Sequence, residues 1–289
     1  MGEYNSSVTR VWPVFDWLFH ADPSGQSWIS SLLHMGSRAD QVEPSVLESP
    51  GMLDPELSDF KRKIPGPLKK VLGAMWVEQL GTIRNAYEIN VPPATAFLRW
   101  LLENPERLQW PKAKGKELVY GAPTQANRKA LIAGNPESKE KALRELAQNG
   151  TIGTQRKWWA FEGYTSVDCV LATDSLLVLI EGKRTEPMST STHWFPDRNQ
   201  LIRNLECARE MARCGNKNFA VLVCAENIID MADVEWEKSL PHMPEGERAE
   251  LQSHFLGCAT WNSIAAELCN GMKLPETVGA AAKLCSEFR

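Results

Sequence analysis

The stretch Leu176-Leu177-Val178-Leu179-Ile180-Glu181-Gly182-Lys183 decides how the middle of the chain folds. Its first five residues are all aliphatic, which predicts a β-strand buried on both faces. The strand then ends at a carboxylate and an ammonium, and burying such groups is costly unless they are paired or bind an ion. Because alternate residues of a strand share a face, Glu181 and Lys183 point the same way and Gly182 points the opposite way.

A second predicted strand, from Val167 to Thr173, precedes this one, and Asp174-Ser175 suits a tight turn between them. If the two strands pair as a hairpin centred on that turn, Asp168 lies opposite Glu181. Two carboxylates at close range repel each other unless a divalent cation neutralises them. Magnesium or manganese suits such an oxygen site, and a nearby lysine can orient or help deprotonate a water bound to the cation.

The segments around the hairpin predict further elements of an α/β domain. A helix from Glu137 to Gln148 precedes a short aromatic strand, Trp158 to Phe161. After the hairpin, Asp197 to Arg213 shows the apolar spacing of an amphipathic helix, and Phe219 to Cys224 reads as another buried strand. The predicted order is therefore helix, three strands, helix, strand, with a mixed central sheet.

Asp168, twelve intervening residues and then Glu181-Gly182-Lys183 resemble the motif of the PD-(D/E)XK nuclease superfamily. The predicted element order is that of the restriction endonuclease-like core of this family, and the resemblance covers residues Glu137 to Glu226. It implies that Asp168 and Glu181 bind the metal, together with the backbone carbonyl of Gly182, and that Lys183 acts on the attacking water. The chain departs from the motif at Val167, where the family name has proline.

The resemblance also suggests outer members of the site and leaves alternatives open. The helix after the third strand commonly carries a glutamine that faces the site, and Gln200 is the candidate, although a surface residue at the start of a helix would look the same. The first helix often adds a glutamate, for which Glu140 and Glu145 are both available. Glu162 is another candidate ligand.

The resemblance implies magnesium- or manganese-dependent hydrolysis of phosphodiester bonds, with DNA as the expected partner and a role in restriction, repair or defence. A catalytically silent nuclease-like scaffold or nucleic-acid-binding subunit is the first alternative. The second is an unrelated α/β enzyme acting on a small molecule, which a deep apolar pocket away from Glu181 would favour. DNA against RNA, endonuclease against exonuclease, and monomer against dimer stay open.

Outside this core the sequence predicts helices and no chemical motif. We expect a mostly helical N-terminal region over 1–115, and over 116–289 a nuclease-like domain with a helical C-terminal extension. The stretch from Ser45 to Ser58 reads as a loop. The helices expected outside the core are Leu68 to Tyr87, Ala94 to Asn104, Leu251 to Phe255, Trp261 to Leu268 and Val278 to Leu284.

Composition places limits on the partners and the compartment. The net charge of −4 is unlike a protein whose whole surface binds nucleic acid, but it permits a focused site. From Lys183 to Arg213 the chain carries six basic and four acidic residues, a net of +2. The seven cysteines match no disulfide or zinc pattern and suit free thiols in a reducing cytosol. The longest apolar run, Phe219 to Ala225, is too short to span a bilayer, so we expect a cytoplasmic protein without membrane contact.

Overall fold

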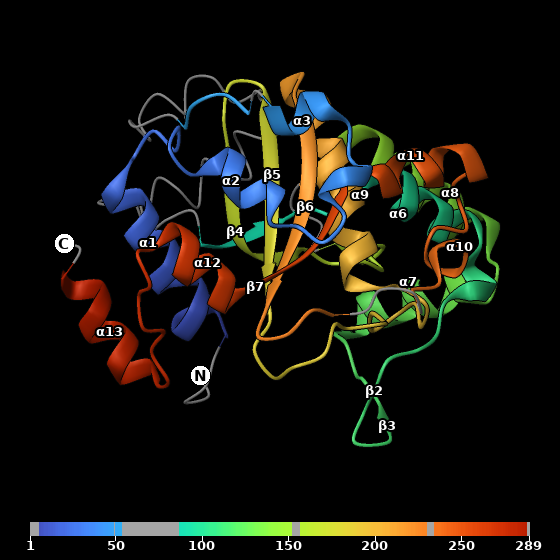
Figure 1. The fold of residues 1–289 in the computed structure, drawn as a ribbon. Coiled ribbons are helices and arrows are strands. Elements are labelled where there is room, and N and C mark those ends of the chain that lie inside the picture. The colour runs from blue at the N-terminus through green and yellow to red at the C-terminus, as the bar shows by residue number, and fades with distance from the viewer. Residues whose placement is uncertain (1–5, 49, 54–86, 152–156, 230–233, 288–289) are drawn as a thin grey trace.

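The computed structural model describes residues 6–48, 50–53, 87–151, 157–229 and 234–287. Its centre is a five-stranded mixed sheet with helices on either side, which confirms the predicted α/β class (Figure 1). The order of strands across the sheet is β1-β4-β5-β6-β7. Their bounds are β1 (Tyr87–Val91), β4 (Thr165–Ala172), β5 (Leu176–Gly182), β6 (Asn218–Ala225) and β7 (Phe255–Thr260).

The pairing of β4 with β5 is the predicted hairpin. The two strands are antiparallel, and Cys169 lies opposite Ile180. Continuing the same register by one residue places Asp168 opposite Glu181. On its other edge β5 runs parallel to β6, with Glu181 beside Val223, and β6 runs parallel to β7.

Of the three consecutive strands predicted before α9, the first is wrong. Trp158 to Phe161 forms a turn rather than a strand, because its residues Trp159 and Phe161 are buried in a separate hydrophobic cluster outside the sheet. The third antiparallel strand is β1, which pairs with β4 from far upstream in the chain. Tyr87, predicted to end a helix, begins this strand, and the rest of that predicted helix lies outside the described residues.

The C-terminal region was predicted to be helical, and this prediction is partly wrong because the region also supplies β7. The helix expected from Leu251 to Phe255 is displaced, because α11 ends at Ser253 and Phe255 already belongs to β7. Near the N-terminus the loop expected from Ser45 is also partly wrong, because a short helix, α3, occupies its beginning. The helices predicted from Ala94, Glu137, Asp197, Trp261 and Val278 are confirmed in α6, α8, α9, α12 and α13.

The helices pack in two groups beside the sheet. In Figure 1, α1, α12 and α13 lie on its left, while α6, α7 and α8 lie on its right; both chain ends are on the left. The helical bounds are η1 (Ser7–Val11), α1 (Trp12–Ala21), α2 (Ile29–His34), η2 (Ala39–Gln41), α3 (Pro44–Glu48), α6 (Thr95–Glu103), η4 (Pro105–Arg107), α7 (Ala122–Ile132), α8 (Pro136–Asn149), α9 (Gln200–Gly215), α10 (Trp236–Ser239), α11 (Glu245–Ser253), α12 (Trp261–Leu268) and α13 (Val278–Glu287). A small hairpin of β2 (Lys112–Ala113) and β3 (Lys116–Glu117) projects from the body.

Helix α9 brings several polar residues to the end of β5, and its sequence explains where it begins. Asn199 caps the helix, since its side chain accepts a hydrogen bond from the backbone N–H of Leu201. A side-chain cap of this kind satisfies a backbone donor that has no partner inside the helix. The buried residues Leu201, Ile202 and Leu205 then hold α9 against the sheet.

Two hydrophobic clusters make up the core. The larger one combines the sheet with α1, α2 and α9, and so joins residues 11–53 to residues beyond 160. The smaller one combines Phe97 and its neighbours on α6 with α8, Trp159 and Trp194. The division into 1–115 and 116–289 stays a prediction. Among the described residues, no helix is long and apolar enough to cross a membrane.

Candidate active site

Three of the predicted site residues meet at the end of β5. The Lys183 ammonium donates to Oε1 of Glu181 at 2.8 Å and to Oε1 of Gln200 at 3.1 Å. The amide nitrogen of Gln200 donates to the same Glu181 oxygen at 2.6 Å. Glu181 and Lys183 are only 3% and 8% exposed. They therefore share one face of the strand, as the alternation of side chains predicts.

Asn204 is a member of this cluster that the sequence analysis missed. Its Nδ2 donates to Oε2 of Glu181 at 3.0 Å, and its Oδ1 accepts from Thr165 on β4 at 3.1 Å. Asn204 follows Gln200 by four residues, so both lie on the same face of α9. The signal was present, because a fully buried asparagine stands beside Leu201 and Leu205 on the apolar face of this helix.

Asp168 lies at the same end of the sheet but contacts different groups. Its Oδ2 accepts from the backbone N–H of Gly182 at 2.7 Å, and its Oδ1 accepts from the hydroxyl of Ser7 at 2.6 Å. Ser7 begins η1, and nothing in the sequence pointed to it. Asp168 and Glu181 share no hydrogen-bond partner within the described part of the chain. We therefore define the Glu181 cluster as Asp168, Glu181, Lys183, Gln200 and Asn204.

Gly182 is required at its position by close packing on the opposite face of β5. A Cβ added there would lie 2.5 Å from Cγ2 of Val11 and 3.2 Å from Cζ2 of Trp261. The same Trp261 donates its indole N–H to the carbonyl of Lys183 at 2.8 Å. These contacts fix the backbone that carries Glu181 and Lys183, so neither side chain depends on a mobile loop for its position.

The two carboxylates are incompletely neutralised by the residues around them. Burial raises the pKa of Glu181 to about 7, and the nearby charge of Asp168 adds to this effect against the opposing Lys183. Burial also raises the pKa of Asp168, in spite of the hydrogen bonds from Ser7 and Gly182. One ammonium therefore faces two carboxylates, and a pKa raised in this way is typical of functional sites.

These residues fit a divalent cation by their remaining acceptor capacity. An ionised carboxylate offers about four lone-pair positions. Glu181 uses three of them for Lys183, Gln200 and Asn204, and Asp168 uses two for Ser7 and Gly182. Within the described ranges, no group of three or more His, Cys, Asp and Glu side chains is arranged to hold a metal. Magnesium commonly binds through one or two carboxylates and keeps several waters.

The alternative acidic ligands considered from the sequence have other partners or positions. Glu162 is buried and pairs with Arg198. Glu145 accepts hydrogen bonds from the indoles of Trp158 and Trp159. Glu140 is exposed on α8. The structure thus brings none of the three into the hydrogen-bonded groups around Glu181 or Asp168.

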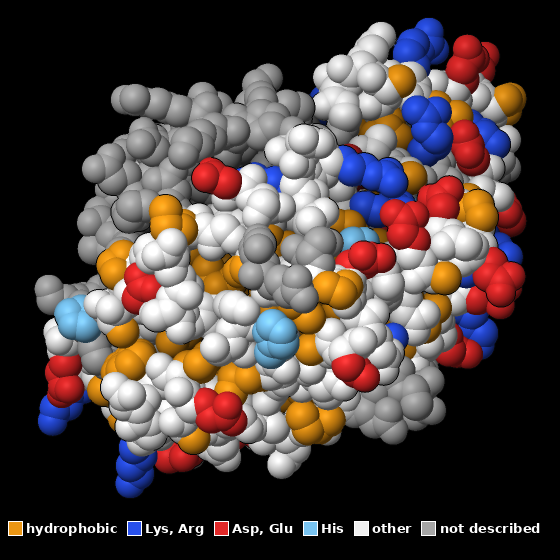
Figure 2. Space-filling view, turned by 45° about the horizontal axis from the view of Figure 1, so that its top comes forward, with side chains coloured by type: hydrophobic (Ala, Val, Ile, Leu, Met, Phe, Trp, Pro, Cys, Tyr) orange, Lys and Arg blue, Asp and Glu red, His pale blue; other side chains and the backbone are white. Residues whose placement is uncertain are grey.

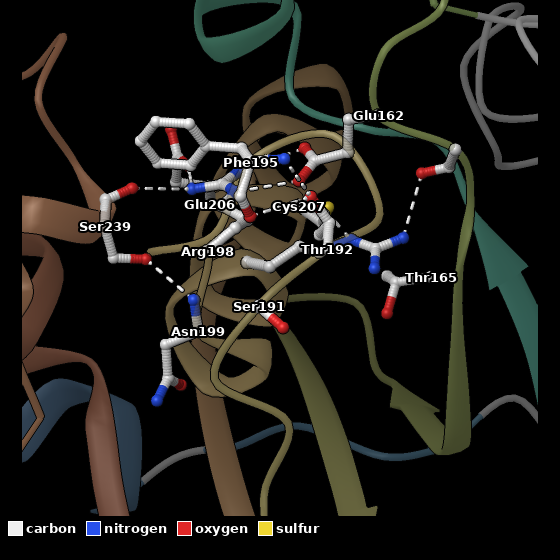
Figure 3. A network of polar contacts seen from close by, with 12 residues as sticks. Glu162, Thr165, Ser191, Thr192, Phe195, Arg198, Asn199, Glu206, Cys207 and Ser239 are labelled. Atoms are coloured by element: carbon white, nitrogen blue, oxygen red, sulfur yellow. Dashed lines mark hydrogen bonds and ion pairs between the residues drawn. The ribbon is translucent and has the colours of Figure 1, made fainter. Parts of the chain in front are cut away.

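Glu162 instead belongs to a second buried charged group, which we call the Arg198 cluster: Arg198, Glu162, Glu206 and His242. Figure 3 shows Arg198 between Glu162 and Glu206. Arg198 donates to both oxygens of Glu162, at 2.8 and 3.1 Å, and pairs with Glu206 at 2.5 Å. His242 contacts Glu206 at 2.7 Å. The guanidinium also lies 3.6 Å from the ring centroid of Phe97.

The Arg198 cluster changes how the basic residues after Lys183 are interpreted. Arg198 is fully buried, and Arg209 is buried beside Met243 and Glu247. Neither can follow a phosphate backbone without leaving its partners. On the face shown in Figure 2, Lys and Arg side chains are intermingled with Asp and Glu and form no broad field of one sign.

A pocket of about 400 Å³ opens next to Lys183. Its walls come from the loop that follows β5 and from the segment that follows β6. Arg184 lies in this wall and pairs with Glu226 and Glu276.

No protein-family model, curated protein or solved structure matches the chain. The candidate site therefore depends on its own geometry.

Proposed function

We propose that the chain is a metal-dependent nuclease with a restriction endonuclease-like core that hydrolyses phosphodiester bonds, DNA being the preferred substrate. One observation carries the proposal: Asp168 stands opposite Glu181 in the hairpin register, and Lys183 and Gln200 both contact the Glu181 carboxylate. The path of the chain gives further support. The β4–β5 hairpin is followed by α9 and then by β6, which returns parallel to β5.

Asp168 and Glu181, with the carbonyl of Gly182, would hold the cation. A cation bound there supplies Lewis acidity and lowers the pKa of a coordinated water. The second carboxylate matters because it adds negative charge against the cation and a ligand from a second strand. The raised pKa values of Asp168 and Glu181 fit this role, since a cation would favour their ionised forms.

Lys183 would orient the attacking water and hold positive charge beside the phosphate. Its ammonium is fixed by Glu181 and Gln200 together, at 2.8 and 3.1 Å. Its backbone N–H donates to the carbonyl of Cys224 at 2.8 Å, which ties it to β6. A charge held in place before the reaction stabilises the transition state without reorganisation at that moment. Gln200 would act as a positioning residue, because it contacts both members of this pair.

The test is cleavage of linear, circular and single-stranded DNA with magnesium or manganese, comparing wild type with Lys183→Ala and Asp168→Ala. Both variants should lose about 100-fold or more of the rate, the usual scale for removing a group that moves or positions a proton. Lys116→Ala, on the exposed β2–β3 hairpin, is the matched lysine control and should keep the rate. Circular substrate separates endonuclease from exonuclease action.

RNA is assayed in parallel, because metal-assisted hydrolysis of a phosphodiester does not by itself require either sugar. Cleavage that the metal chelator EDTA stops and that both variants abolish supports the proposal. A folded, metal-loaded wild type that cuts neither DNA nor RNA would contradict it. The catalytically silent scaffold or nucleic-acid-binding subunit would then be the better account.

A further inference from the structure

The pocket beside Lys183 has a role that the proposed chemistry does not use. Its volume of about 400 Å³ falls within the roughly 300–1,000 Å³ of sites that hold small organic groups. One wall is the loop after β5, with Met188, and the other is the segment after β6, with Ile228 and Ile229. The pocket adjoins the Glu181 cluster at Lys183, which lines the pocket and contacts Glu181.

The charges around the pocket argue for a neutral occupant. Lys183 is paired with Glu181 inside the cluster. Arg184 is paired with Glu276 at 2.5 Å and lies 3.8 Å from Glu226. Both cations among the described lining residues already have carboxylate partners, and Glu186 and Glu226 add negative charge to the lining, so the pocket has no excess of positive charge to hold an anionic group of its own. A neutral group needs no such excess.

The rest of the lining suits a flat group with an apolar face and a polar edge. Ile228 is 56% exposed, although it is a large aliphatic residue, and it lies at this pocket. Asn199 also lines the pocket; its Oδ1 caps α9 and its amide N–H₂ remains as a donor. An exposed aliphatic side chain beside a side-chain amide matches the face and the edge of a nucleobase.

We propose that this pocket holds the base of a nucleotide next to the scissile phosphate, an inference that rests on the proposed nuclease function. A base can enter only after leaving the helical stack. Unstacking costs free energy in a duplex and least in a single strand. The substrate class is therefore DNA with an unstacked nucleotide at the cut: single strands, frayed ends or distorted duplexes, in preference to the interior of regular duplex.

The test uses short single-stranded oligodeoxynucleotides with 2-aminopurine at successive positions, bound in EDTA so that no cleavage occurs. Fluorescence of this base rises when it leaves the stack, and the described residues that line the pocket include no aromatic ring that would quench it. A rise at one position is expected with wild type. Ile228→Asp should weaken binding of that oligonucleotide about 10-fold, equivalent to about 1.4 kcal/mol.

Val119→Asp is the matched control, because Val119 is a large exposed aliphatic residue outside the pocket. It should bind like wild type. Removing the base at the responsive position should weaken binding to wild type but add nothing to Ile228→Asp. Both variants are expected to fold, since each changes an exposed side chain.

The outcomes separate this inference from the proposed function. If wild type cleaves DNA but no position gives a fluorescence rise, or if Ile228→Asp binds like Val119→Asp, the base pocket is wrong and the nuclease stands. If the fluorescence rise and its loss in Ile228→Asp are found while nothing is cleaved, the pocket stands and the catalytic proposal fails. Equal cleavage rates for single strands and the interior of duplex would also overturn the inference.

Discussion

The Glu181 cluster and the Arg198 cluster meet at the start of α9, only two residues apart at Arg198 and Gln200, yet their charges are balanced differently. In the Arg198 cluster a guanidinium reaches both Glu162 and Glu206 (Figure 3). His242 and Arg203 add further donors or charge. In the Glu181 cluster one ammonium faces two carboxylates. Glu181 and Lys183 are buried in the Glu181 cluster, although Asp168 and Gln200 are partly exposed, and Arg198, Glu162 and Glu206 are buried in the Arg198 cluster.

The pKa shifts express this difference. Burial alone would raise the pKa of Glu206, but Arg198 and His242 outweigh it, so its pKa is lowered. Burial raises the pKa of Glu181 to about 7, and Lys183 does not offset it. A buried carboxylate with a lowered pKa has its charge compensated by the protein itself. One with a raised pKa lacks part of that compensation, which is why we assign structure to the first cluster and chemistry to the second.

The largest expected effect is on stability, from Arg198→Ala. Removing one partner of a buried pair leaves the other charged and uncompensated, here Glu162 and Glu206, which costs about 3–5 kcal/mol. Urea denaturation measures this as a lower free energy of unfolding. Arg213→Ala, at the exposed end of α9, should change it by less than about 0.5 kcal/mol. A loss below 1 kcal/mol for Arg198→Ala would mean that its cluster does not support the fold.

The next effect concerns pH. Below about pH 4.5 Glu181 is protonated in both the folded and unfolded states, and between pH 4.5 and 7 only the folded state keeps the proton. The free energy of unfolding therefore falls as pH rises through this window, by about 3 kcal/mol in total at 1.36 kcal/mol per pKa unit, and stays level above it. The Glu181→Gln variant should not show this fall in the free energy of unfolding, because its amide does not titrate.

Urea denaturation of both proteins across this range measures the contribution of Glu181 and of its coupling to Asp168 and Lys183, because the groups remote from Glu181 titrate alike in each. The stability of Glu181→Gln relative to wild type should increase with pH up to about 7. A difference that does not depend on pH would show that Glu181 is already compensated, like Glu206, and would remove the contrast between the clusters.

A smaller effect is expected at Asn204, which joins the Glu181 carboxylate to Thr165 on β4. Asn204→Ala leaves two buried polar groups without this partner, at a cost of about 1–3 kcal/mol. Thermal denaturation should show a lower Tm. The control is Asn262→Ala, because Asn262 is exposed on α12. Asn216→Ala is unsuitable as a control, because the backbone of Asn216 is left-handed and adds strain. A Tm equal to that of Asn262→Ala would place Asn204 outside the cluster.

The smallest effect is expected at the solvent-exposed partner of Arg184. The Glu276 side chain is 74% exposed, so its ion pair with Arg184 should contribute no more than about 1 kcal/mol. Glu276→Gln should leave the urea midpoint almost unchanged and should abolish any salt dependence of this pair. If Glu276→Gln lowered the free energy of unfolding as much as Arg198→Ala, solvent exposure would not explain the difference in strength between these two ion pairs.

The local parts of the site could be predicted from sequence. The register of Asp168 and Glu181 follows from a short turn and strict side-chain alternation, both of which act over few residues. Gln200 was predicted from the family resemblance, which places a glutamine facing the site on the helix after the third strand. Asn204 could have been found by the same helical spacing, since it is a polar residue on the apolar face of α9.

The parts that could not be predicted depend on contacts between distant segments. Tyr87–Val91 pairs with β4 although about eighty residues separate them, and no pattern in either strand specifies the other. Phe255–Thr260 is short and lies between two helices, so its apolar run suits helix or strand equally until β6 lies beside it. The aromatic run at Trp158 looked like a strand because burial alone does not define secondary structure. Ser7 reaches Asp168 only through the packing of η1.

The most direct test of the central claim is a titration with Mn²⁺ at pH 8, followed by the electron paramagnetic resonance signal of the unbound ion. Wild type should bind about one ion at the two carboxylates, which suits a small divalent cation. Asp168→Asn should lose that binding, while Glu140→Gln, which removes an exposed carboxylate on α8, should keep it. Equal binding by wild type and folded Asp168→Asn, or none by wild type, would contradict the assignment of the Glu181 cluster as a metal site.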